Sequence, residues 1–191
     1  MARAASLRIV GGVWRGRALV APDGQTTRPT AERVRQALFD MLAHAPWSPG
    51  IEGRIVLDAF AGSGALALEA LSRGAAHATL FDTDRAAQAA IRANIAGLPG
   101  AAARATWIAA DATRPPRSAS ACDLVFLDPP YAAGLIDPAL AALSAAGWLA
   151  PGALIVAETG REAPAPAGAL LAERTHGAAR LWVWRYEEVL S

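Results

Sequence analysis

Residues 121–131, Ala-Cys-Asp-Leu-Val-Phe-Leu-Asp-Pro-Pro-Tyr, decide the fold of this chain. Residues 122–127 form an almost uninterrupted apolar run, as expected for a strand buried on both faces of a parallel sheet. Asp128 follows at the carboxyl end of this strand, and the two prolines after it cannot donate backbone hydrogen bonds. The carbonyls of Asp128 and Pro129 therefore have no ladder to join and are able to face a ligand.

The residues after this strand are suited to bind a flat polar group. Asp128, Pro129 and Pro130 offer a carboxylate and free carbonyls, and Tyr131 offers an aromatic ring beside them. Acceptors at the edge and a stacking surface at the face suit a planar group that carries an NH2. The alternative is a strand that ends at a proline and continues into an ordinary turn.

Strands and helices alternate through the second part of the chain. Such alternation forms βαβ units, so we expect an α/β fold with a parallel sheet and helices on both faces. A closing hairpin is predicted at 170–174 and 180–189, with Trp182 and Trp184 on one face. The other predicted strands are 55–58, 78–82, 105–109, 123–128 and 153–158, and the predicted helices are 65–73, 85–96 and 138–146.

A small β-hairpin is predicted near the N-terminus. Residues 7–10 and 13–19 flank Gly11-Gly12, a dipeptide that allows the positive φ angles of a tight turn. The second predicted strand carries Trp14 and two arginines. These side chains either clamp RNA, with arginine on phosphate and tryptophan on a base, or belong to a solvated strand with one packing tryptophan.

A helix is predicted over residues 30–43, with Thr30 as its N-cap. Arg28 and Thr30 then lie at a helix N-terminus, whose free amides and positive dipole attract a carboxylate or a phosphate. A stretch rich in proline and glycine follows this helix and reads as a linker. The predicted divisions are a basic extension, a linker and a main domain, at residues 1–44, 45–53 and 54–191.

Charge and composition limit the classes of protein that fit. The net charge is +1, but residues 1–35 hold seven arginines against two carboxylates, which gives +5 there and leaves −4 for the rest. A basic arm on a mildly acidic body indicates a polyanionic partner. The single cysteine, Cys122, excludes an internal disulfide and a cysteine-based metal cluster. No stretch is long and apolar enough to span a membrane. We expect a cytoplasmic protein, and we also expect it to be a monomer without a metal.

The loop after the first strand of the main domain suits a ligand that approaches the backbone closely. Gly62 and Gly64 permit a sharp turn there. Gly62-x-Gly64-x-x-Ala67, with Asp82 twenty residues after Gly62, also satisfies the dinucleotide fingerprint, so NAD is one interpretation. Asp58 favours S-adenosylmethionine, because its carboxylate would lie where a pyrophosphate is needed but suits an ammonium or sulfonium group.

Several motifs resemble those of class I amino-methyltransferases: residues 58–64, the acidic pair Asp82 and Asp84, and residues 128–131. In three further stretches, 8–17, 27–39 and 64–73, the chain is similar to the RsmD family, the bacterial methyltransferases that modify guanine N2 in 16S rRNA. This resemblance covers nearly the whole chain, including the basic arm that generic methyltransferases lack. It departs at Asp82, where the RsmD family commonly has glutamate.

The resemblance implies a Rossmann-like class I methyltransferase fold, with a seven-stranded, mostly parallel sheet, a C-terminal antiparallel hairpin and an N-terminal extension. It implies S-adenosylmethionine as cofactor and a guanine of 16S rRNA, free or in the assembling 30S subunit, as substrate. The predicted site residues are Asp128, Pro129, Pro130 and Tyr131 for catalysis; Thr30, Asp58, Phe60, Gly62, Gly64, Asp82 and Asp111 for the cofactor; and Arg8, Trp14, Arg15, Arg17 and Arg28 for RNA.

In the expected reaction, the Asp128 carboxylate and the Pro129 carbonyl hold the amine while Tyr131 fixes the ring plane. Guanine presents adjacent donors at N1 and N2, which match an acceptor-only carboxylate. The base must be unstacked to reach such a pocket. An adenine-N6 methyltransferase acting on RNA or DNA, an NAD-dependent oxidoreductase and a catalytically silent RNA-binding assembly factor are the alternatives.

Overall fold

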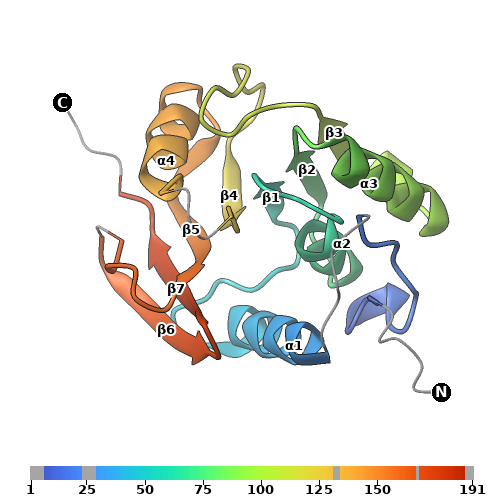
Figure 1. Ribbon diagram of the computed structural model, residues 1–191, viewed down its shortest axis with the longest axis horizontal. Coiled ribbons are helices and arrows are strands. Elements are labelled where there is room, and N and C mark those ends of the chain that lie inside the picture. The colour runs from blue at the N-terminus through green and yellow to red at the C-terminus, as the bar shows by residue number, and fades with distance from the viewer. Residues whose placement is uncertain (1–6, 23–28, 131–133, 167, 188–191) are drawn as a thin grey trace.

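The computed structural model describes residues 7–22, 29–130, 134–166 and 168–187, and its centre is a seven-stranded sheet (Figure 1). The strands are β1 (Ile55–Asp58), β2 (His77–Phe81), β3 (Ala105–Ile108), β4 (Cys122–Leu127), β5 (Leu149–Gly160), β6 (Leu170–His176) and β7 (Ala179–Arg185). They lie in the order β3-β2-β1-β4-β5-β7-β6. β1 to β5 pair in parallel, whereas β7 is antiparallel to β5 and β6. The predicted α/β sheet with its closing hairpin is therefore confirmed.

The helices lie close to their predicted positions, but α1 begins at Pro29, so Thr30 lies within the helix and the prediction of Thr30 as its N-cap is wrong. They are α1 (Pro29–His44), α2 (Ala65–Ser72), α3 (Arg85–Gly97) and α4 (Ile136–Ala145), with short 3-10 turns η1 (Gly12–Trp14) and η2 (Ala101–Ala103). α3 begins at Arg85 because the Asp84 carboxylate accepts a hydrogen bond from the Ala87 amide at 2.9 Å. A local signal in the sequence thus sets the start of α3.

Side chains of the central strands alternate between two buried faces. Along β4, Leu124 and Phe126 join the core that packs against α1, α2 and α3, whereas Val125 and Leu127 join the core beneath α4. Burial on both faces explains why residues 124–127 of β4 are all apolar. In β7 the two tryptophans of the predicted hairpin both belong to the core beneath α4, so they share one face as expected.

The N-terminal segment differs from the predicted hairpin. Residues 7–22, which we call the arm, do fold back on themselves, since the Ile9 amide donates to the Arg17 carbonyl at 2.9 Å. However, η1 lies between the two limbs, and Gly11-Gly12 does not form a two-residue turn. The prediction of a regular hairpin is therefore wrong in its turn and in its second strand.

Packing against α2 explains the two glycines. A Cβ on Gly11 would overlap the guanidinium of Arg73, and a Cβ on Gly12 would overlap the carbonyl of Ser72. Gly12 also has a φ of 73°, in the left-handed region that glycine adopts most easily. The glycines thus let the arm lie directly on the end of α2.

Trp14 fills a buried position and is not displayed on a strand. Its amide donates to Ser72 Oγ at 2.9 Å, and its indole N–H donates to the Pro99 carbonyl at 3.1 Å. The Arg104 guanidinium lies 5.3 Å from the centre of its ring. Only 5% of Trp14 is exposed, so the structure favours the packing interpretation over stacking on a base.

Side chains from α2 and α3 also hold the arm. The Val10 amide donates to Glu69 Oε2 at 2.8 Å, and the Val20 amide donates to Asn94 Oδ1 at 2.7 Å. Buried side chains of the arm belong to the same core as the sheet. The division of the chain at residues 45–53 stays a prediction. Within the described ranges, no helix combines the length and apolarity needed to cross a membrane.

Gly12→Ala should destabilise the protein more than Gly16→Ala. Both glycines have positive φ, 73° and 83°, but a Cβ on Gly16 meets nothing within 4 Å. Gly16→Ala should cost about 1–2 kcal/mol for the left-handed backbone alone. Gly12→Ala adds the overlap with Ser72, roughly another 1–3 kcal/mol. Urea unfolding measures both free energies, and equal losses would contradict the contact between the arm and α2.

Candidate active site at the carboxyl edge of the sheet

A cleft of about 640 Å³ opens at the carboxyl ends of β1, β4 and β5. α1 forms one wall, the loop between β1 and α2 forms another, and the turn between β6 and β7 closes a third side. In a parallel sheet this edge is where ligands bind, because the loops that follow the strands meet there. The carboxylates that line it are Asp58, Asp128 and Glu158.

Asp58 ends β1 as a buried carboxylate with one unused oxygen. It is 1% exposed, and its Oδ2 accepts a hydrogen bond from the Ala67 amide of α2 at 3.2 Å. Its Oδ1 is buried and has no hydrogen-bond partner among the described residues. Burial raises the pKa of Asp58 to about 7, the backbone amides of Ala67 and Phe60 oppose this, and the negative charge of Asp82 adds to it. Such an oxygen suits a cationic ligand group.

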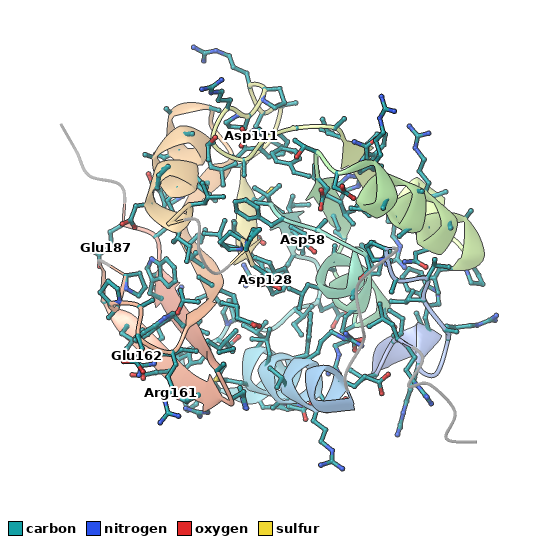
Figure 2. All side chains as sticks on the ribbon, viewed as in Figure 1. Asp58, Asp111, Asp128, Arg161, Glu162 and Glu187 are labelled. Atoms are coloured by element: carbon teal, nitrogen blue, oxygen red, sulfur yellow. The ribbon has the colours of Figure 1, made fainter. Side chains whose placement is uncertain are left out.

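Asp128 follows the end of β4 and lies beside Asp58 near the centre of the molecule (Figure 2). Asp128 is exposed to solvent in the open cleft, whose walls displace part of the water around its carboxylate. This desolvation raises the pKa of Asp128 well above its usual range, and the negative charges of Glu158 and Asp58 raise it further. Carboxyl groups with raised pKa values in a cleft are typical of functional sites.

The glycine loop leaves room for a ligand at one glycine and not at the other. Gly62 has a φ of 54°, and a Cβ there would meet nothing within 4 Å. Gly64 has a φ of 78°, and a Cβ there would press on Leu80 of β2. Gly62 thus faces open space, whereas Gly64 lets α2 start close to the sheet. Phe60, half-buried, lines the cleft beside them.

Asp82 and Asp111 lie outside the lining of this cleft. Asp82 Oδ2 accepts from the Gly62 amide at 2.8 Å, so it shapes the glycine loop directly. Asp111 is exposed, and its Oδ1 accepts from the amide and the hydroxyl of Thr113, both at 2.8 Å. These bonds lower the pKa of Asp111. In Figure 2 Asp111 is well separated from Asp58 and Asp128.

The structure describes some of the remaining predicted site residues and not others. Pro129 is buried beside Asp128, and Pro130 is exposed. In the arm the side chains of Arg8, Arg15 and Arg17 are exposed. The predicted residues that lie outside the described part of the chain are Arg28, Tyr131 and the side chain of Thr30.

Sequence reasoning missed two features of the cleft. Glu158 follows the same rule as Asp58 and Asp128, a carboxylate at the carboxyl end of a parallel strand, and that signal was available. The second feature is the wall formed by α1, and no local pattern in the sequence indicates that this helix lies beside the cleft. Arg35 of α1 is 6% exposed, donates to the Arg8 carbonyl and has its Nε 3.7 Å from Glu69 Oε2. Burial lowers the pKa of Arg35, and the charge of Glu69 opposes this.

Comparison with known proteins agrees with this geometry. The family model described as Conserved hypothetical protein 95 matches residues 7–185. Ribosomal RNA small subunit methyltransferase D of Escherichia coli (strain K12) is 44% identical over 153 residues, 80% of this chain and 74% of that protein. The Haemophilus influenzae protein of the same name is 37% identical over 161 residues, 83% of this chain and 81% of that one.

A solved structure of the Escherichia coli protein yhhF is 39% identical and superposes with a TM-score of 0.78, covering 96% of this chain and 99% of that one. The chain belongs to the RsmD family. The arm lies within the residues that the family model matches. The curated RsmD relatives are methyltransferases, and the oxidoreductase interpretation of the glycine loop is therefore set aside.

Asp58→Asn should remove a pH-dependent loss of stability. Because the folded pKa is about 7, above the usual 3.8, the folded state binds this proton more tightly than the unfolded state. The neutral carboxyl group therefore stabilises the folded protein at low pH, and this stability is lost as pH rises from about 4 to about 7. The loss is on the order of 4 kcal/mol, since one pKa unit corresponds to about 1.4 kcal/mol.

Chemical unfolding at pH 4 and pH 8 measures the change. The stability of Asp58→Asn relative to the parent protein should be higher at pH 8 than at pH 4. The exposed Glu162→Gln serves as a control for removing a surface carboxyl. If Asp58→Asn showed the same relative stability at both pH values, Asp58 would not be a desolvated carboxylate.

Proposed function

We propose that this protein transfers a methyl group from S-adenosylmethionine to the exocyclic N2 amine of a guanine in 16S rRNA, free or in the assembling small subunit. The observation that carries the proposal is Asp128, which follows a buried strand and lies in the cleft beside Asp58. Relatives named as small-subunit rRNA methyltransferases support the substrate class. A cytoplasmic location follows from this substrate.

The residues at the sheet edge fit S-adenosylmethionine. Asp58 has a buried oxygen without a partner among the described residues, which suits the ammonium group of a methionine moiety. Gly62 borders open space, so its backbone can approach a ligand. Asp82 would accept from the ribose hydroxyls, and Asp111 would accept from the adenine amino group through the oxygen that Thr113 does not use. When bound, the cofactor supplies an electrophilic methyl group on a sulfonium.

Asp128 and Pro129 would hold the target amine. The guanine N2 lone pair is delocalised into the ring, and acceptors for its two hydrogens favour a pyramidal, more nucleophilic nitrogen. The Asp128 carboxylate and the Pro129 carbonyl are such acceptors, and proline has no N–H that would compete. Tyr131 is proposed to stack on the base.

Asp128 is also suited to take the proton that the amine loses. An ordinary aspartate, with a pKa near 4, is a weak base at neutral pH. Desolvation in the cleft and the nearby charges of Glu158 and Asp58 raise the pKa of Asp128, so its carboxylate binds a proton more readily. One residue can thus orient the amine and then receive its proton.

The arm is proposed to bind the RNA backbone. Arg15 and Arg17 are exposed, and Arg8 pairs with Glu32 of α1 at 3.4 Å while half of its side chain stays accessible. Trp14 is excluded from this role because it is buried. Arg28 and Thr30 are proposed to contact both ligands.

Asp128→Ala should abolish methyl transfer, by at least about 100-fold, and leave S-adenosylmethionine affinity nearly unchanged. Small subunits from a strain lacking this protein serve as substrate, with labelled cofactor, and mass spectrometry of the digested RNA identifies the product. N2-methylguanine is expected. N6-methyladenine would support the adenine alternative, and calorimetry checks cofactor binding.

Asp128→Asn controls for shape, and the pH profile tests the charge. The ionised carboxylate is the better acceptor, so the rate should fall as pH falls through the raised pKa of Asp128. The Asp128→Asn variant should not show this fall in rate at low pH. Near-normal turnover by Asp128→Ala would show that Asp128 does not hold the amine.

Arg15→Gln and Arg17→Gln together should weaken RNA binding and flatten its salt dependence. With fewer phosphate contacts, RNA binding releases fewer counterions, so the negative slope of log affinity against log salt should become shallower by about 1 to 2. Cofactor affinity should not change. Arg161→Gln, an exposed arginine between β5 and β6, is the matched control. An unchanged slope in the double variant would place the RNA elsewhere.

A further inference from the structure

The strand register makes Asp128 and Glu158 neighbours. Leu127 of β4 is paired with Ala157 of β5 in the parallel ladder, and both side chains belong to the core beneath α4. Because side chains alternate along a strand, the next residues, Asp128 and Glu158, point to the opposite face, toward α1. Both line the cleft, and so does Leu181, the β7 partner of Glu158.

The charges of the two carboxylates act on each other. The pKa of Asp128 is raised first by burial and then by Glu158, which places the Glu158 charge within electrostatic reach of the proposed amine holder. Two carboxylates that line one cleft from adjacent strands repel each other. A ligand that offers two adjacent donors would relieve that repulsion, and a ligand that offers one donor beside one acceptor would not.

Guanine and adenine differ in this respect. The Watson-Crick edge of guanine carries donors at N1 and N2, whereas adenine carries a donor at N6 and an acceptor at N1. Adjacent strands are about 4.8 Å apart, and glutamate is one methylene longer than aspartate, so both carboxylates can converge on neighbouring nitrogens of one base. A carboxylate is an acceptor only and cannot pair with the N1 of adenine.

We propose that Glu158 is a specificity-determining residue that accepts the N1–H of the target guanine while Asp128 holds N2. This inference rests on the proposed function. It assigns the choice between guanine and adenine to β5, since the Asp-Pro-Pro-Tyr motif after β4 needs only an amine. A matched donor at N1 should favour the correct base by about tenfold to a hundredfold.

The test uses 2-aminopurine, which keeps the 2-amino group of guanine but has an acceptor at N1. The target nucleotide is first mapped with unmodified subunits. 16S rRNA carrying guanine or 2-aminopurine at that position is then assembled into small subunits, and kcat/KM for methyl transfer is measured with the full-length protein. The parent protein should prefer guanine by at least about tenfold.

Glu158→Gln should narrow that preference at least tenfold, because the glutamine amide can donate to the N1 of 2-aminopurine. The exposed Glu162→Gln, distant from Asp128 in Figure 2, should keep the parent's preference. Calorimetry with S-adenosylmethionine and thermal unfolding verify that Glu158→Gln is folded.

The outcomes separate the two proposals. If the parent protein methylated 2-aminopurine as fast as guanine, the role of Glu158 would be overturned without any variant. If Glu158→Gln slowed both substrates equally, the role would also be overturned, while N2-methylguanine formed by the parent protein would leave the proposed function standing. Absence of N2-methylguanine from the parent reaction would overturn both.

Discussion

The arrangement of the cleft depends on one buried carboxylate, Glu69 of α2. It is fully inaccessible to solvent and accepts from the Val10 amide and from Arg73 Nε, both at 2.8 Å. Its Oε2 also lies 3.7 Å from Arg35 Nε. Removing Glu69 leaves the buried Arg35 guanidinium without its nearest counter-charge and the Val10 amide without its acceptor, and the loss of one member of a buried ion pair typically costs about 3–5 kcal/mol. Glu69 therefore holds the arm, α1 and α2 in one arrangement.

This arrangement connects the two sides of the proposed site. α1 is a wall of the cleft, so its attachment to α2 sets the opening above the strand ends. Asn94 of α3 makes a second connection: its Nδ2 donates to the Val20 carbonyl of the arm at 2.9 Å and to the Ser63 carbonyl of the glycine loop at 2.8 Å. The surface proposed to bind RNA and the loop proposed to hold the cofactor thus share buried partners.

Electrostatics at the sheet edge agree with the proposed chemistry. Three carboxylates, Asp58, Asp128 and Glu158, line one cleft, and the pKa values of Asp58 and Asp128 are raised chiefly by burial. Such a cluster favours ligands that bring cations and hydrogen-bond donors. A sulfonium cofactor with an ammonium group and an aminopurine base supply both.

The sequence by itself determined the sheet and its strand ends. Apolar runs, helix caps and the glycine loop are local signals, and from them came the positions of the helices and strands, the placement of Asp58 and Asp128 in one cleft and the shared face of Trp182 and Trp184. The resemblance to the RsmD family rested on the same local motifs, and the comparisons confirmed it.

Only the tertiary structure decided the rest. Gly11-Gly12 carries the local signature of a turn, yet its glycines are needed because α2 packs against them. Trp14 is buried by residues far along the chain, and Val10 bonds to Glu69 across 59 residues. Periodicity and φ preferences act between near neighbours in sequence, whereas these contacts depend on how separate elements pack, which no local pattern contains.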